Sequence, residues 1–105
     1  VDDDEGDTEG GSAYEAFAYE ARATDAFLDH RFEEAKMAFE VALHLRIAAL
    51  GDDELTAASA SDSGLCCEML GLHEEALAHH TEALRIREKL LGRSHLHSAA
   101  AMHSL

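Results

Sequence analysis

The chain matches itself when it is shifted by 41 residues. The matched pairs are Phe32–Ala35 with His73–Ala76, Ala42–Leu43 with Ala83–Leu84, Leu50–Gly51 with Leu91–Gly92, and Ala58 with Ala99. They keep one register without a gap, which a shared composition alone would not produce. A fixed period of about 20–50 residues is typical of a repeat array, in which each unit buries its apolar face against its neighbours.

Two helices are predicted in each period. Between residues 32 and 50 apolar side chains recur at spacings of three and four residues, the pattern of an amphipathic helix. The sequence contains no proline and much alanine, which favours helix throughout. Glycine is expected to end three of the helices, at Gly51, Gly71 and Gly92. The predicted helices cover residues 13–28, 32–50, 53–70, 74–91 and 94–105.

The chain divides into an acidic segment and one helical domain. Residues 1–11 hold six acidic residues and no basic one, and such a segment is predicted to be disordered. The capping box Ser12–Glu15 predicts where order begins. The domain 12–105 then comprises repeat one (13–50), repeat two (53–91) and the start of a third repeat or a capping helix (94–105).

A motif in the second copy carries a resemblance to a known family. Its positions are Ser63, Gly64, Cys67, Gly71, His73, Glu75, Ala76, His80, Ala83 and Leu84. A small residue inside the first helix, a glycine turn and two alanines on the second helix resemble the tetratricopeptide repeat. The resemblance covers residues 13–105 and implies an all-α fold: a solenoid of stacked antiparallel helix pairs, with about two and a half repeats.

The match to the family pattern is uneven. The first copy has Ala23 and His30 where the family has glycine. The junction after the second copy is similar to the longer repeats of kinesin light chain, although Leu96 stands where those repeats usually have proline. The residues that carry this similarity are Ala83, Leu84, Ile86, Glu88, Leu90, Leu91, Gly92, His95 and Ala99.

The family resemblance implies a concave binding surface lined by the first helix of each repeat. The implied groove residues are Phe17, Glu20, Thr24, Phe27, Leu28, Ala58, Ser61, Leu65, Glu68, Met69, Ala99 and Met102. Phe17, Phe27 and Met69 would be apolar contacts, and Glu20 and Glu68 would receive a cation or backbone amides of a bound peptide or helix. The alternative is that Phe17 and Phe27 belong to the core.

Negative charge dominates the chain. Its formal net charge is −14, with 22 acidic and 8 basic residues. Because Lys and Arg supply most nucleic-acid affinity, this balance disfavours nucleic acid and an anionic membrane surface as partners. No apolar run approaches the ~20 residues that cross a bilayer. A basic protein or peptide is the complementary partner; the alternative is that the charge only maintains solubility.

Histidines and cysteines are the residues that hint at site chemistry. A zinc site needs three or four converging ligands, whereas His79 and His80 point ~100° apart on a helix, so no metal site is predicted. The adjacent Cys66 and Cys67 diverge on a helix, and no phosphate loop or catalytic-triad spacing is present. We therefore predict no catalytic residue, no enzyme activity and no cofactor. A metal-dependent activity is the alternative, and the histidines also allow a pH-sensitive surface.

The function predicted from the sequence is that of a scaffold, which binds a partner peptide or helix in its groove. The alternative is a structural section of a longer solenoid, or a module that self-associates through the open C-terminal helix 94–105. Two cysteines are too few for a secreted disulfide scaffold, which favours a reducing compartment. The resemblance implies a cytoplasmic location, cytoskeleton-associated proteins included.

Overall fold

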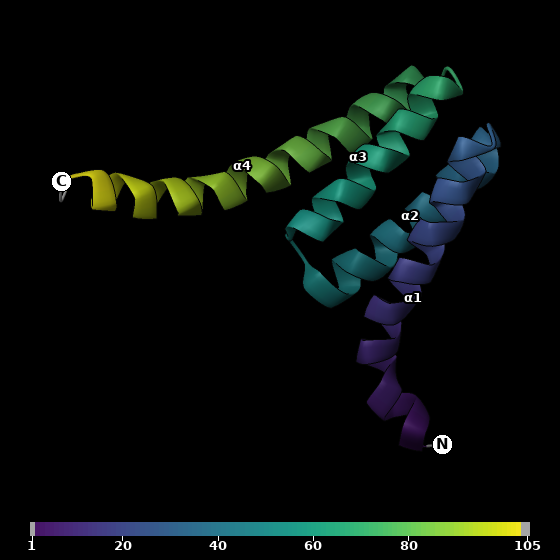
Figure 1. Ribbon diagram of the computed structural model, residues 1–105, viewed down its shortest axis with the longest axis horizontal. Helices are drawn as coiled ribbons and strands as arrows, with labels where there is room; N and C mark the ends of the chain where they lie inside the picture. The colour runs from purple at the N-terminus through teal and green to yellow at the C-terminus, as the bar shows by residue number, and fades with distance from the viewer. Residues whose placement is uncertain (1, 104–105) are drawn as a thin grey trace.

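Four α-helices make up the described part of the chain (Figure 1). The structure is a computed structural model that describes the backbone of residues 2–103 and the side chains of residues 14–93. Its helices are α1 (Asp2–Leu28), α2 (Phe32–Leu50), α3 (Glu54–Met69) and α4 (His73–His103). Consecutive helices run antiparallel and pack side by side, α1 on α2, α2 on α3 and α3 on α4. This arrangement confirms the predicted all-α class of stacked helix pairs.

The junction between the two pairs has the signals expected from the sequence. Gly51 ends α2 with a φ of 63°, and its amide donates to the carbonyl oxygen of Ile47 at 3.0 Å. Asp53 then caps α3, because its carboxylate accepts from the Leu55 amide at 2.9 Å. The predicted ends of the second helix agree with the structure, and the third helix lies within one residue of its predicted bounds.

The turns inside the two helix pairs have the same geometry. His30 follows α1 with a φ of 62°, and Gly71 follows α3 with a φ of 78°. In both turns the next residue donates its amide to the carbonyl five residues earlier at 2.8 Å, as in a Schellman motif. His30 therefore holds the left-handed conformation that the family pattern assigns to glycine, at a cost that glycine would avoid.

Two predicted helix ends differ from the structure. α1 begins at Asp2, so the segment 1–11, predicted to be disordered, is helical from its second residue. Acidic residues suit the positive end of a helix dipole, and no proline interrupts this stretch. α4 continues through Gly92 to His103, in place of a stop and a new helix over 94–105. Glycine inside a helix costs only about 1 kcal/mol, so Gly92 does not by itself end α4.

Alanine and other small side chains form much of the described core. Four alanines on α2 and α4, Ala35, Ala42, Ala76 and Ala83, are at most 3 % exposed. Two clusters result. One contains Ala23, Ala26, Ala35, Phe39 and Cys66, and the other contains Leu43, Ala57, Ala60, Ala83 and Ile86. Such small contacts bring helix backbones close together. None of the described helices combines the length and apolar character needed to span a membrane.

A glycine provides the close contact between α3 and α4. A Cβ atom added to Gly64 would lie 2.8 Å from the imidazole Cε1 of His80. The ring therefore rests on the bare backbone of α3, where its Nε2 lies 2.6 Å from the Glu68 carboxylate. Gly64 thus leaves the space that the neighbouring helix α4 occupies with His80.

Charged pairs join the loop before α3 to the second half of the repeat. The carboxylate of Asp52 lies 2.8 Å from the Arg85 guanidinium and 2.9 Å from the Lys89 ammonium. Hydrogen bonds from Arg85 and then Lys89 hold the pKa of the Asp52 carboxyl well below its usual range. These exposed pairs orient the loop more than they stabilise it.

Candidate partner-binding groove

A shallow pocket lies between α1 and α3, the helices that the sequence assigned to the groove. Thr24 and Phe27 line it from α1, Asp62 and Leu65 line it from α3, and Phe39 of α2 completes the lining. Its volume is about 200 Å³, which suits one side chain rather than a whole small molecule. The fold thus brings together three predicted groove residues from two repeats.

The lining side chains are held by contacts on their own helices and on the core. Phe27 packs against the first core cluster and meets the Phe32 ring edge-on, with ring centroids 5.2 Å apart. The Thr24 hydroxyl donates to the Glu20 carbonyl oxygen at 2.9 Å, which fixes its rotamer. Leu65 remains 40 % exposed. The two readings of Phe27 are therefore compatible, because one face of its ring packs inward while the ring also lines the pocket.

Asp62 gives the pocket a negative group. Burial and then the nearby Glu20 carboxylate raise the pKa of the Asp62 carboxyl, while Arg46 acts in the opposite direction. Among residues 14–93, no hydrogen bond or ion pair satisfies this carboxylate. A half-buried carboxylate without a direct partner is suited to receive a cation from a ligand.

Glu20 is held in a buried network between three helices. Arg46 of α2 is 3 % exposed, and its Nη1 donates to the Glu20 carboxylate at 3.0 Å and to the Ser59 hydroxyl at 2.8 Å. Ser59 in turn donates to Glu20 at 2.6 Å. The Arg46 guanidinium also lies 5.2 Å from the centre of the Phe17 ring, a cation–π contact. Glu20 was predicted to receive a cation or backbone amides of a bound peptide or helix, but in this structure it is paired with Arg46 of the same chain.

Comparison with known proteins agrees with this arrangement of helices. A sequence model described as Tetratricopeptide repeat matches residues 14–89 and, in an overlapping second match, residues 56–105. The chain belongs to the tetratricopeptide repeat family. No curated protein and no solved structure matches it. Tetratricopeptide repeats generally mediate protein–protein interaction, and the family typically consists of non-enzymatic scaffolds.

The other predicted groove residues of this tetratricopeptide array lie around the pocket rather than in it. Leu28 and Met69 are 72 % and 50 % exposed near the ends of α1 and α3. Ala58 and Ser61 are half-buried on α3. The remaining predicted residues are placed as follows: Phe17 is 58 % exposed, Glu68 contacts His80, and the side chains of Ala99 and Met102 lie outside the described residues.

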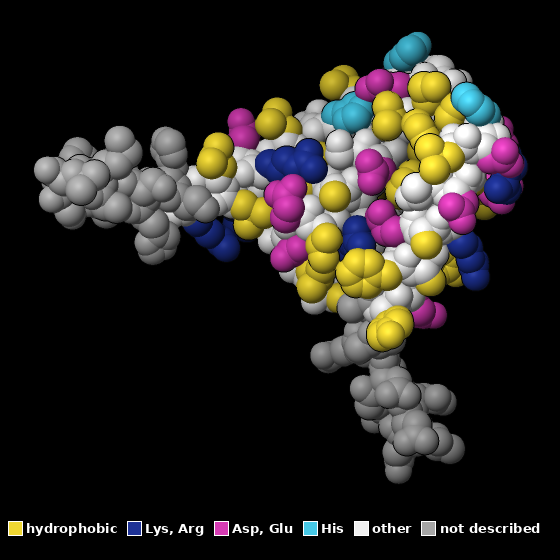
Figure 2. All heavy atoms as spheres, in the orientation of Figure 1, with side chains coloured by type: hydrophobic (Ala, Val, Ile, Leu, Met, Phe, Trp, Pro, Cys, Tyr) yellow, Lys and Arg dark blue, Asp and Glu magenta, His cyan; other side chains and the backbone are white. Residues whose placement is uncertain are grey.

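Hydrophobic, acidic, basic and histidine side chains are interspersed over the face of the molecule in Figure 2. This face therefore presents apolar and charged side chains close to one another.

Three residues of the pocket or of the Glu20 network were not predicted from the sequence. Asp62 lies three residues before Leu65, so it shares that helix face, and its position was available as a signal. Arg46 aligns with Arg87 of the second repeat, so the repeat indicated that both have the same role. It did not indicate that Arg46 is buried. The role of Ser59 could not be predicted, because it depends on a hydrogen bond to Glu20, 39 positions away in the sequence.

The cysteines of this tetratricopeptide chain lack the character of nucleophiles. Cys66 and Cys67 are both free and buried. Burial raises the pKa of the Cys66 thiol to about 11, and burial and the nearby Glu75 carboxylate raise that of Cys67. Both thiols are therefore protonated at neutral pH, and the thiolate is the nucleophilic form. A separate group, Glu40, Cys67 and His79, has ligand atoms close enough to hold a metal ion and is considered below.

Proposed function

We propose that this chain is a non-enzymatic interaction module that holds a segment of a partner protein in the groove between α1 and α3. The observation that carries the proposal is the pocket in which the Asp62 carboxylate lies beside apolar side chains. Family membership supports protein binding in general, and the pocket adds where a partner side chain would enter.

The chemistry of the pocket favours a long basic side chain. The methylene stem of Lys or Arg would pack on Phe27 and Leu65, while its cation would reach Asp62. A pocket of about 200 Å³ accommodates one such side chain. The net charge of −14 would attract a basic segment before contact. The partner proposed is therefore a basic peptide or helix, in which one Lys or Arg is the anchor.

An arrayed library of basic peptides, with order-scrambled copies as controls, provides the probe. Peptides that bind would be titrated by calorimetry into the parent chain and into the variants Asp62→Asn and Leu65→Ala. We expect each variant to weaken binding by about tenfold or more, because each removes a direct contact with the anchor side chain of the peptide. Asp25→Asn is the matched control, because it removes the same charge from an exposed position of α1 outside the pocket.

Two results would contradict the proposal. One is equal weakening by Asp62→Asn and Asp25→Asn, which would mean that only the overall charge attracts the peptides. The other is binding that both pocket variants leave unchanged. Thermal melting of each variant checks that the helices remain folded.

A second candidate function is supported by the outer face of repeat one. Tyr19, Met37 and Val41 border a depression of about 260 Å³ there, and Met37 is 66 % exposed. In a solenoid, such a face packs against the next helix pair. The chain would then be a structural section of a longer array, or would associate with itself. Sedimentation of the parent chain and of Met37→Glu at several concentrations tests this: a parent that stays monomeric throughout would contradict it.

Two narrower statements belong to the proposal. The motif at the end of repeat two supports assignment of these repeats to the kinesin-light-chain type. The free, buried cysteines Cys66 and Cys67 fit a reducing compartment, and a cytoplasmic location, with or without cytoskeletal association, is proposed on that ground.

A further inference from the structure

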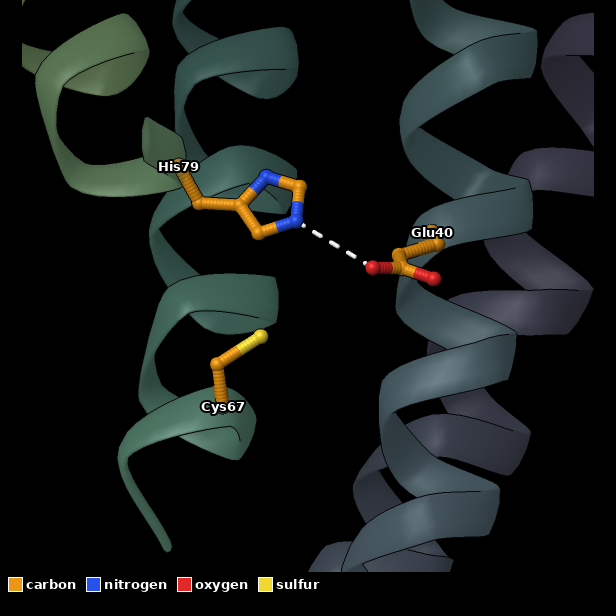
Figure 3. Close-up of side chains that lie close together, drawn as sticks. All are labelled: Glu40, Cys67 and His79. Atoms are coloured by element: carbon orange, nitrogen blue, oxygen red, sulfur yellow. Dashed lines mark hydrogen bonds and ion pairs between the residues drawn. The ribbon is translucent and has the colours of Figure 1, made fainter. Parts of the chain in front are cut away.

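Three side chains, one each from α2, α3 and α4, lie close together. Glu40 comes from α2, Cys67 from α3 and His79 from α4, and their side chains point toward one another (Figure 3). The carboxylate oxygen, sulfur and ring nitrogen that could bind an ion all lie within 4.8 Å of one another. None of the three lines the pocket between α1 and α3.

The spacing of these atoms is close to that of a zinc coordination shell. In tetrahedral zinc sites, bonds of about 2.0–2.3 Å place neighbouring ligand atoms roughly 3.3–3.7 Å apart. The Nε2 of His79 already lies 3.2 Å from the Glu40 carboxylate. Cys67 needs only a small side-chain adjustment to join them, since its sulfur lies within 4.8 Å of both.

The set of donors favours zinc over magnesium or calcium. Thiolate and imidazole are ligands of Zn²⁺ and of softer transition metals, whereas Mg²⁺ and Ca²⁺ take oxygen ligands almost throughout. The three residues also occupy partly or fully buried positions, with Cys67 completely buried. A buried thiol with a histidine and a carboxylate at ligand distance is therefore a better zinc site than an exposed acidic cluster.

The surrounding charges can accommodate the ion. Lys36 lies 3.5 Å from Glu40 but closer, at 3.2 Å, to Glu75. Zinc would take the place of Lys36 beside Glu40, and the ammonium would keep Glu75 as its partner. With Cys67 ionised, the charges of Glu40, Glu75 and Cys67 balance those of Lys36 and Zn²⁺.

We propose that Glu40, Cys67 and His79 bind one Zn²⁺ ion, with water at the fourth position. Glu40 contributes a carboxylate oxygen, neutral His79 contributes Nε2, and Cys67 loses its thiol proton to solvent as the sulfur–zinc bond forms. Glu40 belongs to repeat one, and the other two ligands belong to repeat two. The ion would therefore join the two repeats across an interface whose side chains are mostly small.

The test is titration of the reduced chain with zinc chloride, followed by calorimetry, and with cobalt chloride, followed by absorption spectroscopy. We expect one zinc ion per chain, a higher melting temperature, and a thiolate-to-cobalt charge-transfer band that zinc abolishes. Cys67→Ser should remove the band and weaken zinc binding by more than about 100-fold, because loss of a partner behind a ligand already costs about 10–100-fold. Cys66→Ser and His80→Gln are matched controls and should retain the site.

Histidines elsewhere in the chain provide the competing explanation. If they alone bound the metal, Cys67→Ser would bind zinc as tightly as the parent and cobalt would give no thiolate band, and the proposal would be wrong. Absence of saturable binding at micromolar zinc would also refute it. Should Cys67→Ser fail to fold, His79→Gln and Glu40→Gln, at partly exposed positions, decide the question by the same two readouts.

Discussion

The buried pair of Arg46 and Glu20 yields the sharpest prediction about stability. Arg46 is 3 % exposed, and its Nη1 contacts the Glu20 carboxylate, the Ser59 hydroxyl and the Leu55 carbonyl oxygen. Replacing it with methionine keeps much of its volume but leaves Glu20 without a cation. The three variants to compare are Arg46→Met, Glu20→Gln and the double variant.

The expected magnitudes follow from the burial of the two groups. Breaking a buried ion pair costs about 3–5 kcal/mol, because the remaining charge has no compensation. The Glu20 side chain is 19 % exposed, so water relieves part of this, and we expect about 3 kcal/mol for Arg46→Met. Glu20→Gln should cost about 2 kcal/mol, since Arg46 retains two other acceptors. The double variant should lose only about 3 kcal/mol, a coupling energy of about 2 kcal/mol.

Urea denaturation followed by circular dichroism measures these free energies. The chain itself is expected to unfold with about 5–15 kcal/mol, so a loss of 3 kcal/mol is readily resolved. Arg87→Met is the matched control: Arg87 occupies the equivalent position in repeat two, and its Glu54 partner is 65 % exposed. That pair should contribute at most about 1 kcal/mol. Equal costs for the two arginine variants, or an additive cycle, would refute the reasoning.

Three further predictions concern single turns and contacts. His30→Gly should raise the free energy of unfolding by about 1 kcal/mol in urea titration, because it relieves the left-handed backbone, and Gly71→Ala should lower it by a similar amount. Alanine favours a helix over glycine by about 1 kcal/mol, but in the parent chain the added methyl group of Gly64→Ala would clash with the His80 imidazole. Gly64→Ala should therefore stabilise the chain by about 1 kcal/mol only when His80→Ala is also present. An equal change in stability with and without His80→Ala would contradict the clash. The pKa of Asp52 is lower in the folded state than in the unfolded state, where it is about 4. Ionised Asp52 therefore stabilises the fold above about pH 4, and this contribution is lost as the pH falls through the folded-state pKa. The melting temperature of the parent should exceed that of Asp52→Asn most at about pH 7, and the difference should shrink in acid.

Helix positions and the repeat were predictable because they depend on local sequence. The second helix was predicted at its observed bounds, since its apolar spacing and the glycine that follows it act within a few residues. The predicted stop at Gly92 was wrong for the same local reason. Glycine is tolerated inside a helix at a cost of about 1 kcal/mol, so Gly92 alone does not decide whether α4 ends there.

The sequence by itself determined the all-α class and the 41-residue period, and the family resemblance led to the prediction of a groove on α1 and α3. Only the tertiary structure decided which side chains meet across helices. Arg46 finds Glu20 and Ser59 in this way, and His79 finds Glu40 and Cys67. The physical reason is that hydrogen bonding along one helix fixes the direction of each side chain, whereas its partner depends on the register and crossing of helices far apart in the chain.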